Sequence, residues 1–390
     1  MITVYVPCDA SAVSLGADEV AHAIQAEADK ANTAIKIIRN GSRGLFWLEP
    51  MVEVATPQGR IAYGPVSESD VAGLFAAGFL QGAEHALRLG KPEEIPYLKN
   101  QERLTFERCG VIDPLSIEDY IAHGGYRGLA NALKTQPADI VTAVTESGLR
   151  GRGGAGFPTG IKWKTVLGCK ADQKYIVCNA DEGDSGTFAD RMIMEGDPLV
   201  LIEGMTIAGI ATGATYGYIY IRSEYPHAIA KVETAINACA HMIEPFVVEV
   251  RVGAGAYVCG EETSLLNSLE GKHSLPAQSS AVPGHARLRG PATAVNNVET
   301  LCNVPHIVLR GAVWYAGIGP PKSTGPRLFS VTQAGAPCNT TLTPTEAGTR
   351  LVSCAIGLYA TIESKELGGA RYGWRHDDRE APSSCSPKTQ

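Results

Sequence analysis

Apolar and polar residues alternate along the first ninety positions with the spacings of short strands and helices. Residues 2–6 (ITVYV) have the period of a strand, and Val20, Ala23 and Ile24 have the spacing of one helix face. The pattern predicts a strand, a helix, a strand, a hairpin and a helix, at residues 2–6, 18–30, 35–38, 51–66 and 68–89. We therefore expect a small mixed α/β unit at the start of the chain.

From Ser116 onward, helical and strand-like segments alternate. Ser116 is suited to cap a helix, because Glu118 and Asp119 follow in the first turn, where carboxylates suit the helix dipole. Further helices are predicted at 126–133, 139–147, from 199 onward and at 227–239, and strands at 174–178, 218–222 and 246–252. This alternation predicts a doubly wound α/β domain with a parallel sheet.

Two stretches lack this periodicity. Residues 91–114 are polar and contain Pro92, Pro96 and Pro114, which is typical of a linker. After Gln333 the chain shows little periodicity and ends in a polar tail. The expected organisation is a first domain, a linker, a main domain and an irregular C-terminal part, at residues 1–90, 91–114, 115–320 and 321–390.

Residues 148–163 (GLRGRGGAGFPTGIKW) place five glycines between Gly148 and Gly156, ahead of a lysine-tryptophan pair at Lys162 and Trp163. Glycines accept positive φ and let backbone N–H groups surround an anion, and Arg150, Arg152 and Lys162 add positive charge. The alternative is an ordinary turn, because the chain holds 43 glycines in 390 residues. We predict a phosphate-binding loop.

Polar side chains follow apolar strands at three later points. They are Asp181, Glu182 and Asp184, then Glu261 and Glu262 at the head of a helix, and then Asn296 and Asn297 before another helical run. Because the carboxyl ends of parallel strands meet at one edge of a sheet, these residues and the glycine loop predict a single nucleotide-binding crevice. The alternatives are solvated carboxylates and helix caps.

Composition narrows the function class. A hydrophobic content of 44% fits a globular protein, and a net charge of −7 argues against nucleic acid. The N-terminus has no basic segment or long apolar run, so no secretion signal is expected. The apolar stretch 199–221 is interrupted by Glu203 and glycines, which favours buried core over a membrane span. We expect a cytoplasmic protein.

Ten cysteines are scattered along the chain, and the closest two are Cys169 and Cys178. No CxxC sequence occurs. Iron-sulfur and zinc sites normally take at least two ligands from one tight loop, so we expect no metal site and reduced thiols.

The glycine loop and the three polar segments that contain Asp181, Glu261 and Asn296 are four motifs in a fixed order. Together they resemble the FMN-containing, NADH-oxidising subunit of complex I-type NADH dehydrogenases, of bidirectional hydrogenases and of NAD-dependent molybdenum formate dehydrogenases. The resemblance runs from about Gly148 to Glu270 and resumes at Asn296. The segment NADEGDSGTFADR (179–191) and the N-terminal part are most similar to the formate dehydrogenase beta subunit. The resemblance implies an N-terminal thioredoxin-like domain, a Rossmann-like FMN-binding α/β domain, and an incomplete ubiquitin-like segment beginning at residues 327–332.

The resemblance also assigns roles to individual residues. Those implied to hold FMN through its phosphate are Gly151, Arg152, Gly153, Gly154, Ala155, Gly156, Lys162, Asn296 and Asn297. Asn179, Asp181 and Gly260 would reach the ribityl chain and the ring, and Tyr257 is a further cofactor-binding position. Phe157 would stack on the adenine of NADH. Glu182, Asp184, Glu261 and Glu262 would line the nicotinamide-ribose side, and Glu182, Asp184 and Glu262 are the residues expected to act in catalysis.

The chain departs from the family in two places. The lysine and paired prolines that help to grip NADH after Gly271 are missing, and Arg287 and Arg289 are the candidate substitutes for the missing cation. The CxxCxxC motif and distant cysteine that hold a 4Fe-4S cluster in the family are also absent, and the thioredoxin-like domain has only Cys8 where related domains use four cysteines.

The implied function is hydride transfer between NAD(H) and FMN in a cytosolic NAD-dependent formate dehydrogenase. Its implied partners are a molybdenum-containing catalytic subunit and a small iron-sulfur subunit. The alternatives are the flavin subunit of a hydrogenase or of complex I, and a non-catalytic truncated scaffold or assembly subunit.

Overall fold

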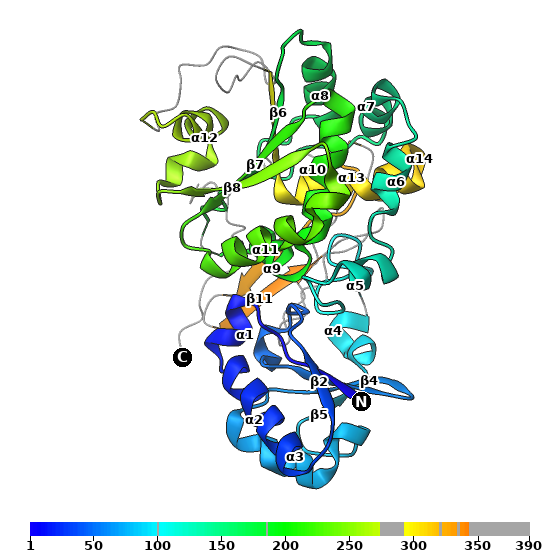
Figure 1. Cartoon of the computed structure of the whole chain (residues 1–390), viewed down its shortest axis with the longest axis vertical. Helices are drawn as coiled ribbons and strands as arrows, with labels where there is room; N and C mark the ends of the chain where they lie inside the picture. The colour runs from blue at the N-terminus through cyan, green and yellow to red at the C-terminus, as the bar shows by residue number, and fades with distance from the viewer. Residues whose placement is uncertain (100, 185, 274–291, 320–321, 334–335, 343–390) are drawn as a thin grey trace, which may run out of the picture.

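The computed structural model of the chain describes residues 1–99, 101–184, 186–273, 292–319, 322–333 and 336–342. They form two units, which Figure 1 shows one above the other. The N-terminal unit, in blue and cyan, lies below, and a larger unit, in green and yellow, lies above. Each unit is built around one sheet. The mixed α/β class predicted from the sequence is confirmed.

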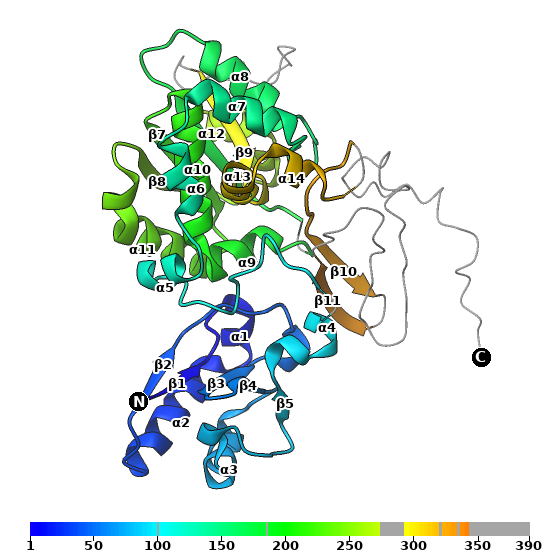
Figure 2. The same ribbon diagram turned by 90° about the vertical axis from the view of Figure 1, so that its right-hand side faces the viewer.

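The sheet of the N-terminal unit has the order β2-β1-β3-β4-β5. β1 runs parallel to β2, and the other neighbours are antiparallel. Val20 and Ile24 on α2 are fully buried and pack with Val4 and Val54 of the sheet. Figure 2 shows helix α2 and this sheet from the side. The elements are β1 (Ile2–Tyr5), α1 (Ala10–Ser14), α2 (Ala17–Lys30), β2 (Ile35–Ile38), β3 (Val52–Thr56), β4 (Gly59–Tyr63), α3 (Val71–Ala77) and β5 (Arg88–Gly90).

The helix predicted at residues 68–89 was wrong in its length. Only α3 is α-helical there, because Gly78 follows it with φ +82° and ends the helix in the left-handed conformation. Gly82 has φ +77° and ends a short 3-10 turn, after which the chain enters β5. The apolar spacing in the sequence continues past both glycines, but the helical conformation of the backbone ends at Gly78.

Residues 91–114, expected as a linker, contain the short helix α4 (Pro96–Lys99). The side chains of Phe106, Cys109 and Ile112 have no exposed surface and belong to the core of the larger unit. The segment therefore packs against both units, because Tyr97 and Leu98 of α4 share a buried cluster with Leu45 and Met51 of the N-terminal unit.

The larger unit is organised around a parallel sheet of four strands in the order β8-β7-β6-β9. Its chain moves from β6 to β7 to β8 in one direction and then returns to place β9 on the other side of β6. The strand order therefore reverses between β6 and β9, which is the kind of position where ligands bind in open α/β sheets. The strands are β6 (Tyr175–Ala180), β7 (Tyr216–Arg222), β8 (Val247–Gly253) and β9 (Thr293–Asn297).

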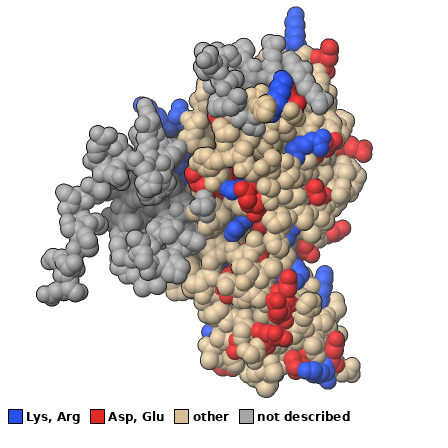
Figure 3. Space-filling view, turned by 90° about the vertical axis from the view of Figure 1, so that its left-hand side faces the viewer, with Lys and Arg blue, Asp and Glu red and all other residues tan. Residues whose placement is uncertain are grey.

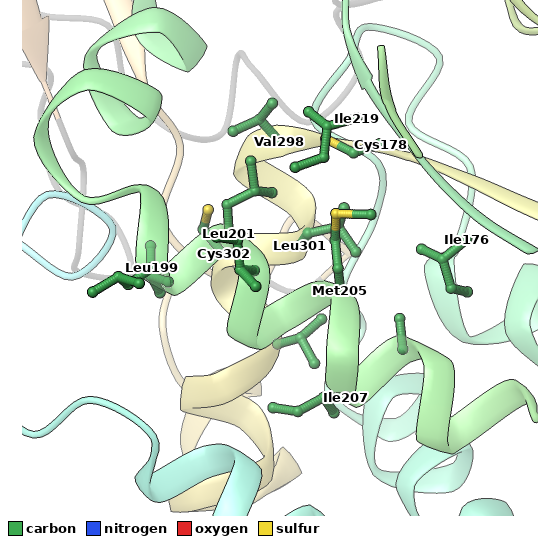
Figure 4. Packing of buried hydrophobic residues seen from close by; sticks show 14 of the residues in the cluster. Ile176, Cys178, Leu199, Leu201, Met205, Ile207, Ile219, Val298, Leu301 and Cys302 are labelled. Carbon is green, nitrogen blue, oxygen red and sulfur yellow. The ribbon is translucent and has the colours of Figure 1, made fainter. Parts of the chain in front are cut away.

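Helices cover both faces of this sheet. Apolar side chains of α10 and α13 pack against Ile176, Cys178 and Ile219 on one face, as Figure 4 shows. On the other face, Leu265 and Leu266 of α12 pack against the sheet. The helices of this unit are α5 (Ile117–Ala122), α6 (Arg127–Ala132), α7 (Pro137–Glu146), α8 (Thr159–Gly168), α9 (Ala189–Gly196), α10 (Pro198–Thr212), α11 (Pro226–Ile243), α12 (Glu262–Leu269), α13 (Val298–Arg310) and α14 (Ala312–Ala316).

The contact between α10 and α13 is unusually close. A Cβ added at Gly204 of α10 would lie 2.2 Å from the carbonyl oxygen of Leu301 on α13. Nearly every residue of α10 is buried, which explains the apolar run read from the sequence there. In the part of the chain that the structure describes, no helix combines the length and apolar character needed to cross a bilayer.

The C-terminal part is described only as far as residue 342. It holds the antiparallel pair β10 (Phe329–Gln333) and β11 (Ala336–Leu342), so the strand predicted at 327–332 is present. Residues 343–390, and with them most of the expected ubiquitin-like remnant and tail, lie outside the described residues. Arg287 and Arg289, and the segment expected to replace the lysine-proline grip, also lie outside them.

The two units meet at polar contacts around α1 and α9. The backbone N–H of Ala10 donates to Glu195 Oε2 at 2.7 Å, and Arg191 Nη2 donates to the Ser11 hydroxyl at 2.9 Å. Nearby, the rings of Phe46 and Phe188 make an edge contact with centroids 5.4 Å apart. Figure 3 shows one surface of the molecule, where acidic side chains run down the lower, N-terminal unit with basic ones among them.

The buried carboxyl groups at and near this junction should make the stability of the fold depend on pH. Burial raises the pKa of Glu195 to about 7 and that of Glu49 to about 8, and the negative charge of Asp9 opposes ionisation of both. In the unfolded chain both glutamates return to about 4.5, so the folded state binds more protons than the unfolded state between pH 4.5 and about 8. We expect the melting temperature, measured by calorimetry, to fall as pH rises through this window. In a Glu195→Gln variant the melting temperature should fall less over the same pH range. A wild-type melting temperature that rises toward pH 8 would contradict the raised pKa values of Glu195 and Glu49 in the folded state.

Candidate functional site

The carboxyl edge of the parallel sheet brings together polar residues that are far apart in sequence. Asn179 on β6 pairs in register with Asn297 on β9, and Cys178 pairs with Asn296. Asn179 Nδ2 donates to the carbonyl oxygen of Gly260 at 2.9 Å. Loops following β6, β8 and β9 therefore meet at one edge, as predicted.

The glycine loop lies against the end of β9. Gly148, Gly154 and Gly156 have φ of +71°, +101° and +62°, conformations that other residues rarely adopt. The loop closes on itself through the N–H of Gly151, which donates to the Phe157 carbonyl at 2.9 Å. A Cβ added at Gly153 would lie 3.2 Å from Cβ of Asn297. The loop thus has the backbone freedom and the position expected of a phosphate-binding turn.

Helix α8 follows the loop and supplies two buried side chains. Lys162 is 8% exposed, and its Nζ donates to Glu262 Oε2 at 2.9 Å and to the Val295 carbonyl at 2.8 Å. Trp163 is fully buried, and its Nε1 donates to Asn296 Oδ1 at 2.9 Å. Lys162 therefore joins α12 to β9, and Trp163 fixes the orientation of the Asn296 amide.

The other loop cations differ from Lys162. Arg150 is exposed. The side chain of Arg152 is 1% exposed and turns into the protein, where its Nη2 donates to the Thr324 carbonyl at 2.7 Å and its Nε lies 3.7 Å from Glu299 Oε1. Its backbone N–H donates to Thr300 Oγ1 at 2.8 Å. Arg152 thus holds the loop onto α13 from within.

In the loop after β6, the side chain of Glu182 is buried and that of Asp184 is exposed. Glu182 is buried and accepts from the N–H groups of Asp190 and Arg191 and from the Tyr225 hydroxyl, so it ties the loop to the first turn of α9. Burial raises the pKa of Glu182, and these hydrogen bonds partly oppose the shift. Asp184 is exposed and accepts from the Tyr257 hydroxyl at 2.8 Å.

Asp181 lies between these two environments. Burial raises its pKa to about 6, although Arg222 pulls it down. Its backbone N–H donates to Asn179 Oδ1 at 3.1 Å, which fixes both ends of the Asn179 amide. The half-buried Phe157 lies at the end of the glycine loop.

The loop after β8 contains a 3-10 turn at Tyr257–Gly260 and leads into α12. Glu261 is the N-cap of α12 and accepts from the N–H groups of Thr263 and Ser264, so it has the helix-capping role considered as an alternative. Partial burial raises the pKa of Glu261, but these hydrogen bonds outweigh it and the pKa is lowered. Glu262 Oε1 is buried and has no hydrogen-bond partner among the described residues.

Several residues of this region were not predicted from the sequence. Asn297 Nδ2 donates to Asp190 Oδ2 at 2.6 Å, and Thr300 and Glu299 lie behind the glycine loop. Trp163 could have been identified, since it adjoins Lys162 in a short helix. Nothing in the sequence indicated that Asp190 points back to the sheet edge.

Within the described ranges, no group of three histidine, cysteine or acidic side chains is arranged to hold a metal ion. Most of the cysteines in these ranges, including Cys178 and Cys302, are buried. The site offers backbone N–H groups, one buried ammonium group and three asparagine amides, which suit a phosphate and a polar planar ring rather than a metal.

Comparisons with known proteins agree with this chemistry. A family model described as "Complex1_51K: Nuo51 FMN-binding domain" matches residues 144–306, which contain the glycine loop and all four strands of the parallel sheet. The FMN cofactor predicted from the sequence is thereby confirmed for this domain.

The proteins of known name that are similar to this chain include subunits of a hydrogenase and of NADH-quinone oxidoreductases. The chain is 50% identical over 243 residues to the HndC subunit of the NADP-reducing hydrogenase of Solidesulfovibrio fructosivorans, covering 60% of this chain and 49% of that protein. It is 49% identical over 240 residues to an F subunit of the NADH-quinone oxidoreductase of Rhizobium meliloti, covering 58% of this chain and 57% of that protein. With the F subunit of the NADH-quinone oxidoreductase of Rhodobacter capsulatus it shares 41% identity over 306 residues, 74% of this chain and 67% of that protein. The chain spans about half the length of the first two relatives.

One solved structure is similar over most of the chain. It is that of an NAD+-reducing [NiFe]-hydrogenase in the air-oxidized state, with a TM-score of 0.54 and 27% sequence identity. The similarity covers 90% of this chain and 62% of the other.

Proposed function

Because the chain belongs to the complex I 51 kDa-type family of flavoprotein subunits, we propose that it transfers hydride between NAD(H) and an FMN bound at the carboxyl edge of its parallel sheet. The observation that carries the proposal is the meeting of the glycine loop, Asn179, Gly260 and Asn297 where the strand order reverses.

We assign the phosphate end of FMN to the glycine loop and the N-terminus of α13. The positive φ of Gly154 and Gly156 frees backbone N–H groups, and Lys162, on the helix that follows the loop, supplies a buried positive charge. Residues 151–156 would contribute mainly backbone, because the Arg152 side chain is committed to the interior. Asn296 and Asn297 complete this end, while Asn179, Asp181 and Gly260 would contact the ribityl chain and the ring edge.

The NAD(H) side is assigned to the loops that flank this cradle. Bound FMN supplies hydride acceptance and donation, so the protein's task is to position the two ligands. The unpartnered Oε1 of Glu262 supports a hydrogen-bond donor from the ligand, such as a ribose hydroxyl. Phe157 would stack on adenine, and Glu182, Asp184, Tyr257 and Glu261 would shape the nicotinamide-ribose side.

The larger complex is proposed from resemblance. We favour a cytoplasmic NAD-dependent formate dehydrogenase with a molybdenum-containing subunit and a small iron-sulfur subunit, because residues 179–191 and the N-terminal segment resemble its beta subunit. The alternative, that the chain serves a hydrogenase or a complex I-type enzyme, has equal support, because the relatives named above are subunits of such complexes. The strand order β2-β1-β3-β4 supports a thioredoxin-like domain at 1–90, in front of the FMN domain at 115–320 and a ubiquitin-like remnant.

The test is to purify the chain, add FMN and remove the excess. We expect a yellow protein with the visible absorbance of bound flavin and NADH-dependent reduction of an artificial dye. A protein that stays colourless would instead support a non-catalytic scaffold. Purification with the native partners, followed by assays with formate and with hydrogen, would distinguish the complexes.

A Glu262→Gln variant is expected to keep FMN but to bind NADH more weakly. Hydrogen bonds to charged groups contribute about 1.5–3 kcal/mol, so we expect the KM for NADH to rise by roughly tenfold or more. Flavin absorbance after gel filtration and steady-state kinetics separate the two effects. Glu146→Gln, on the exposed end of α7, is the charge-matched control and should change neither. Loss of flavin from Glu262→Gln would place the residue on the FMN side instead.

A further inference from the structure

Three carboxyl groups from separate elements lie together in the interior beside the glycine loop. Glu182 comes from the loop after β6, Asp190 from α9 and Glu299 from α13, and they are 9%, 7% and 5% exposed. Each acts electrostatically on at least one of the others. Three buried negative charges so close together would repel strongly.

The neighbours of the three groups differ. Glu299 lies 3.7 Å from the Arg152 guanidinium and is also influenced by Arg327. Glu182 accepts two backbone N–H groups and the Tyr225 hydroxyl.

Burial is the main cause that raises the pKa of Asp190, and the negative charges of Glu182 and Glu299 raise it further. Asp190 accepts from Asn297 Nδ2 and from the backbone N–H of Glu299. Burial raises the pKa values of the Cys178 and Cys302 thiols, and the negative charge of Asp190 raises them further. The guanidinium of the adjacent Arg191 is directed toward Ser11 and the ring of Phe188. Of the three carboxyl groups, Asp190 has the environment that most favours a neutral acid.

The bond from Asn297 connects this cluster to the site. The Asn297 amide is held at both ends: its Oδ1 accepts from the N–H of Thr300 at 3.2 Å, and its Nδ2 donates to Asp190 at 2.6 Å. Asn297 is the N-cap of α13 and lies directly against Gly153. The Asn297 side chain therefore both caps α13 and packs against the glycine loop.

We propose that Asp190, in its neutral form, is a positioning residue that holds Asn297 in place for the anionic cofactor, and that cofactor binding takes up a proton at this carboxyl cluster wherever the pH is high enough to have begun to ionise it in the free protein. The proposal rests on the proposed function for the identity of the cofactor. Ionised Asp190 would add negative charge beside a site that receives a phosphate, so ionisation and FMN binding oppose each other.

The first test measures FMN affinity by quenching of flavin fluorescence between about pH 6 and pH 9, where uptake of one proton changes Kd by up to about tenfold per pH unit. We expect the wild-type Kd to rise with pH. Asp190→Asn should bind FMN with a shallower pH dependence, because its amide imitates the neutral acid. Asp190→Ala should weaken binding about fivefold across the range, because Asn297 loses its acceptor. Glu195→Gln, which removes a buried carboxyl at the other end of α9, should keep the wild-type dependence.

The second test needs no cofactor. In the FMN-free protein, the difference in melting temperature between Asp190→Asn and wild type should grow from about pH 5.5 to about pH 8, because the wild type must keep a proton on Asp190 that the unfolded chain releases. A difference in melting temperature that stays constant with pH would overturn the proposal. In the FMN titration, it would be overturned if Asp190→Asn kept the wild-type pH dependence of Kd, or if Asp190→Ala bound FMN with full affinity. Failure of the wild type to bind FMN would count against the proposed function, and the melting experiment would still decide the role of Asp190.

Discussion

A Gly154→Val variant is expected to lose FMN while remaining folded. Gly154 has φ +101°, a conformation that a β-branched residue reaches only with strain. Such strain amounts to about 1–3 kcal/mol, so relieving it by reshaping the loop should raise the Kd for FMN by roughly 10- to 100-fold. The measurement is fluorescence titration of the FMN-free protein, with circular dichroism to verify folding.

Gly59→Val is the matched control. Gly59 has φ +111° in the hairpin between β3 and β4, with no atom within 4 Å of an added Cβ. The backbone strain should be similar, so this variant should lose stability in the N-terminal unit and keep its affinity for FMN. If Gly154→Val bound FMN as tightly as Gly59→Val does, the glycine loop would not be the phosphate site.

A Gly204→Ala variant is expected to destabilise the larger unit severely. Alanine is favoured over glycine within a helix by about 1 kcal/mol, which alone would stabilise the protein. The added Cβ would lie 2.2 Å from the Leu301 carbonyl oxygen, however, so α10 and α13 must move apart. Overpacking of this kind costs about 3 kcal/mol, which outweighs the gain. Urea unfolding followed by tryptophan fluorescence should show the midpoint shifted to lower urea.

Gly73→Ala isolates the helix preference from the packing. Gly73 is exposed on α3, and the nearest atom to its added Cβ is His85 Nε2 at 3.9 Å. This variant should be neutral or more stable by up to about 1 kcal/mol. Equal effects of the two substitutions would mean that the α10–α13 contact is looser than described.

Much of the fold could be predicted because its signals are local. The strands β6, β7 and β8 are apolar runs, and the Ser116 cap and the helix that follows it agree with the prediction. The predicted 68–89 helix failed because apolar spacing does not report the left-handed conformation of Gly78. The packing of Phe106 and Ile112 in segment 91–114 depends on tertiary contacts that proline content does not reveal.

The site was predicted at the level of motifs more fully than at the level of side chains. The glycine loop, Asn179, Gly260 and Asn297 come together because parallel strands end at one edge. The inward direction of Arg152 depends on Thr324, a residue 172 positions away, and so has no local signal. Asp190 was hidden for the same reason, since its partner Asn297 is 107 positions away.

Helix α9 is fastened at both ends by different parts of the protein. Its first turn is held by Glu182 from the loop that follows β6, and Glu195 near its last turn is held by the N-terminal unit through Ala10. An eight-residue helix is only about 12 Å long and behaves as a stiff strut over that length. Through α9, the N-terminal unit is therefore connected by hydrogen bonds to the loop that carries Asp181 and Asp184, so a change in the position of that unit would be felt at the proposed cofactor site.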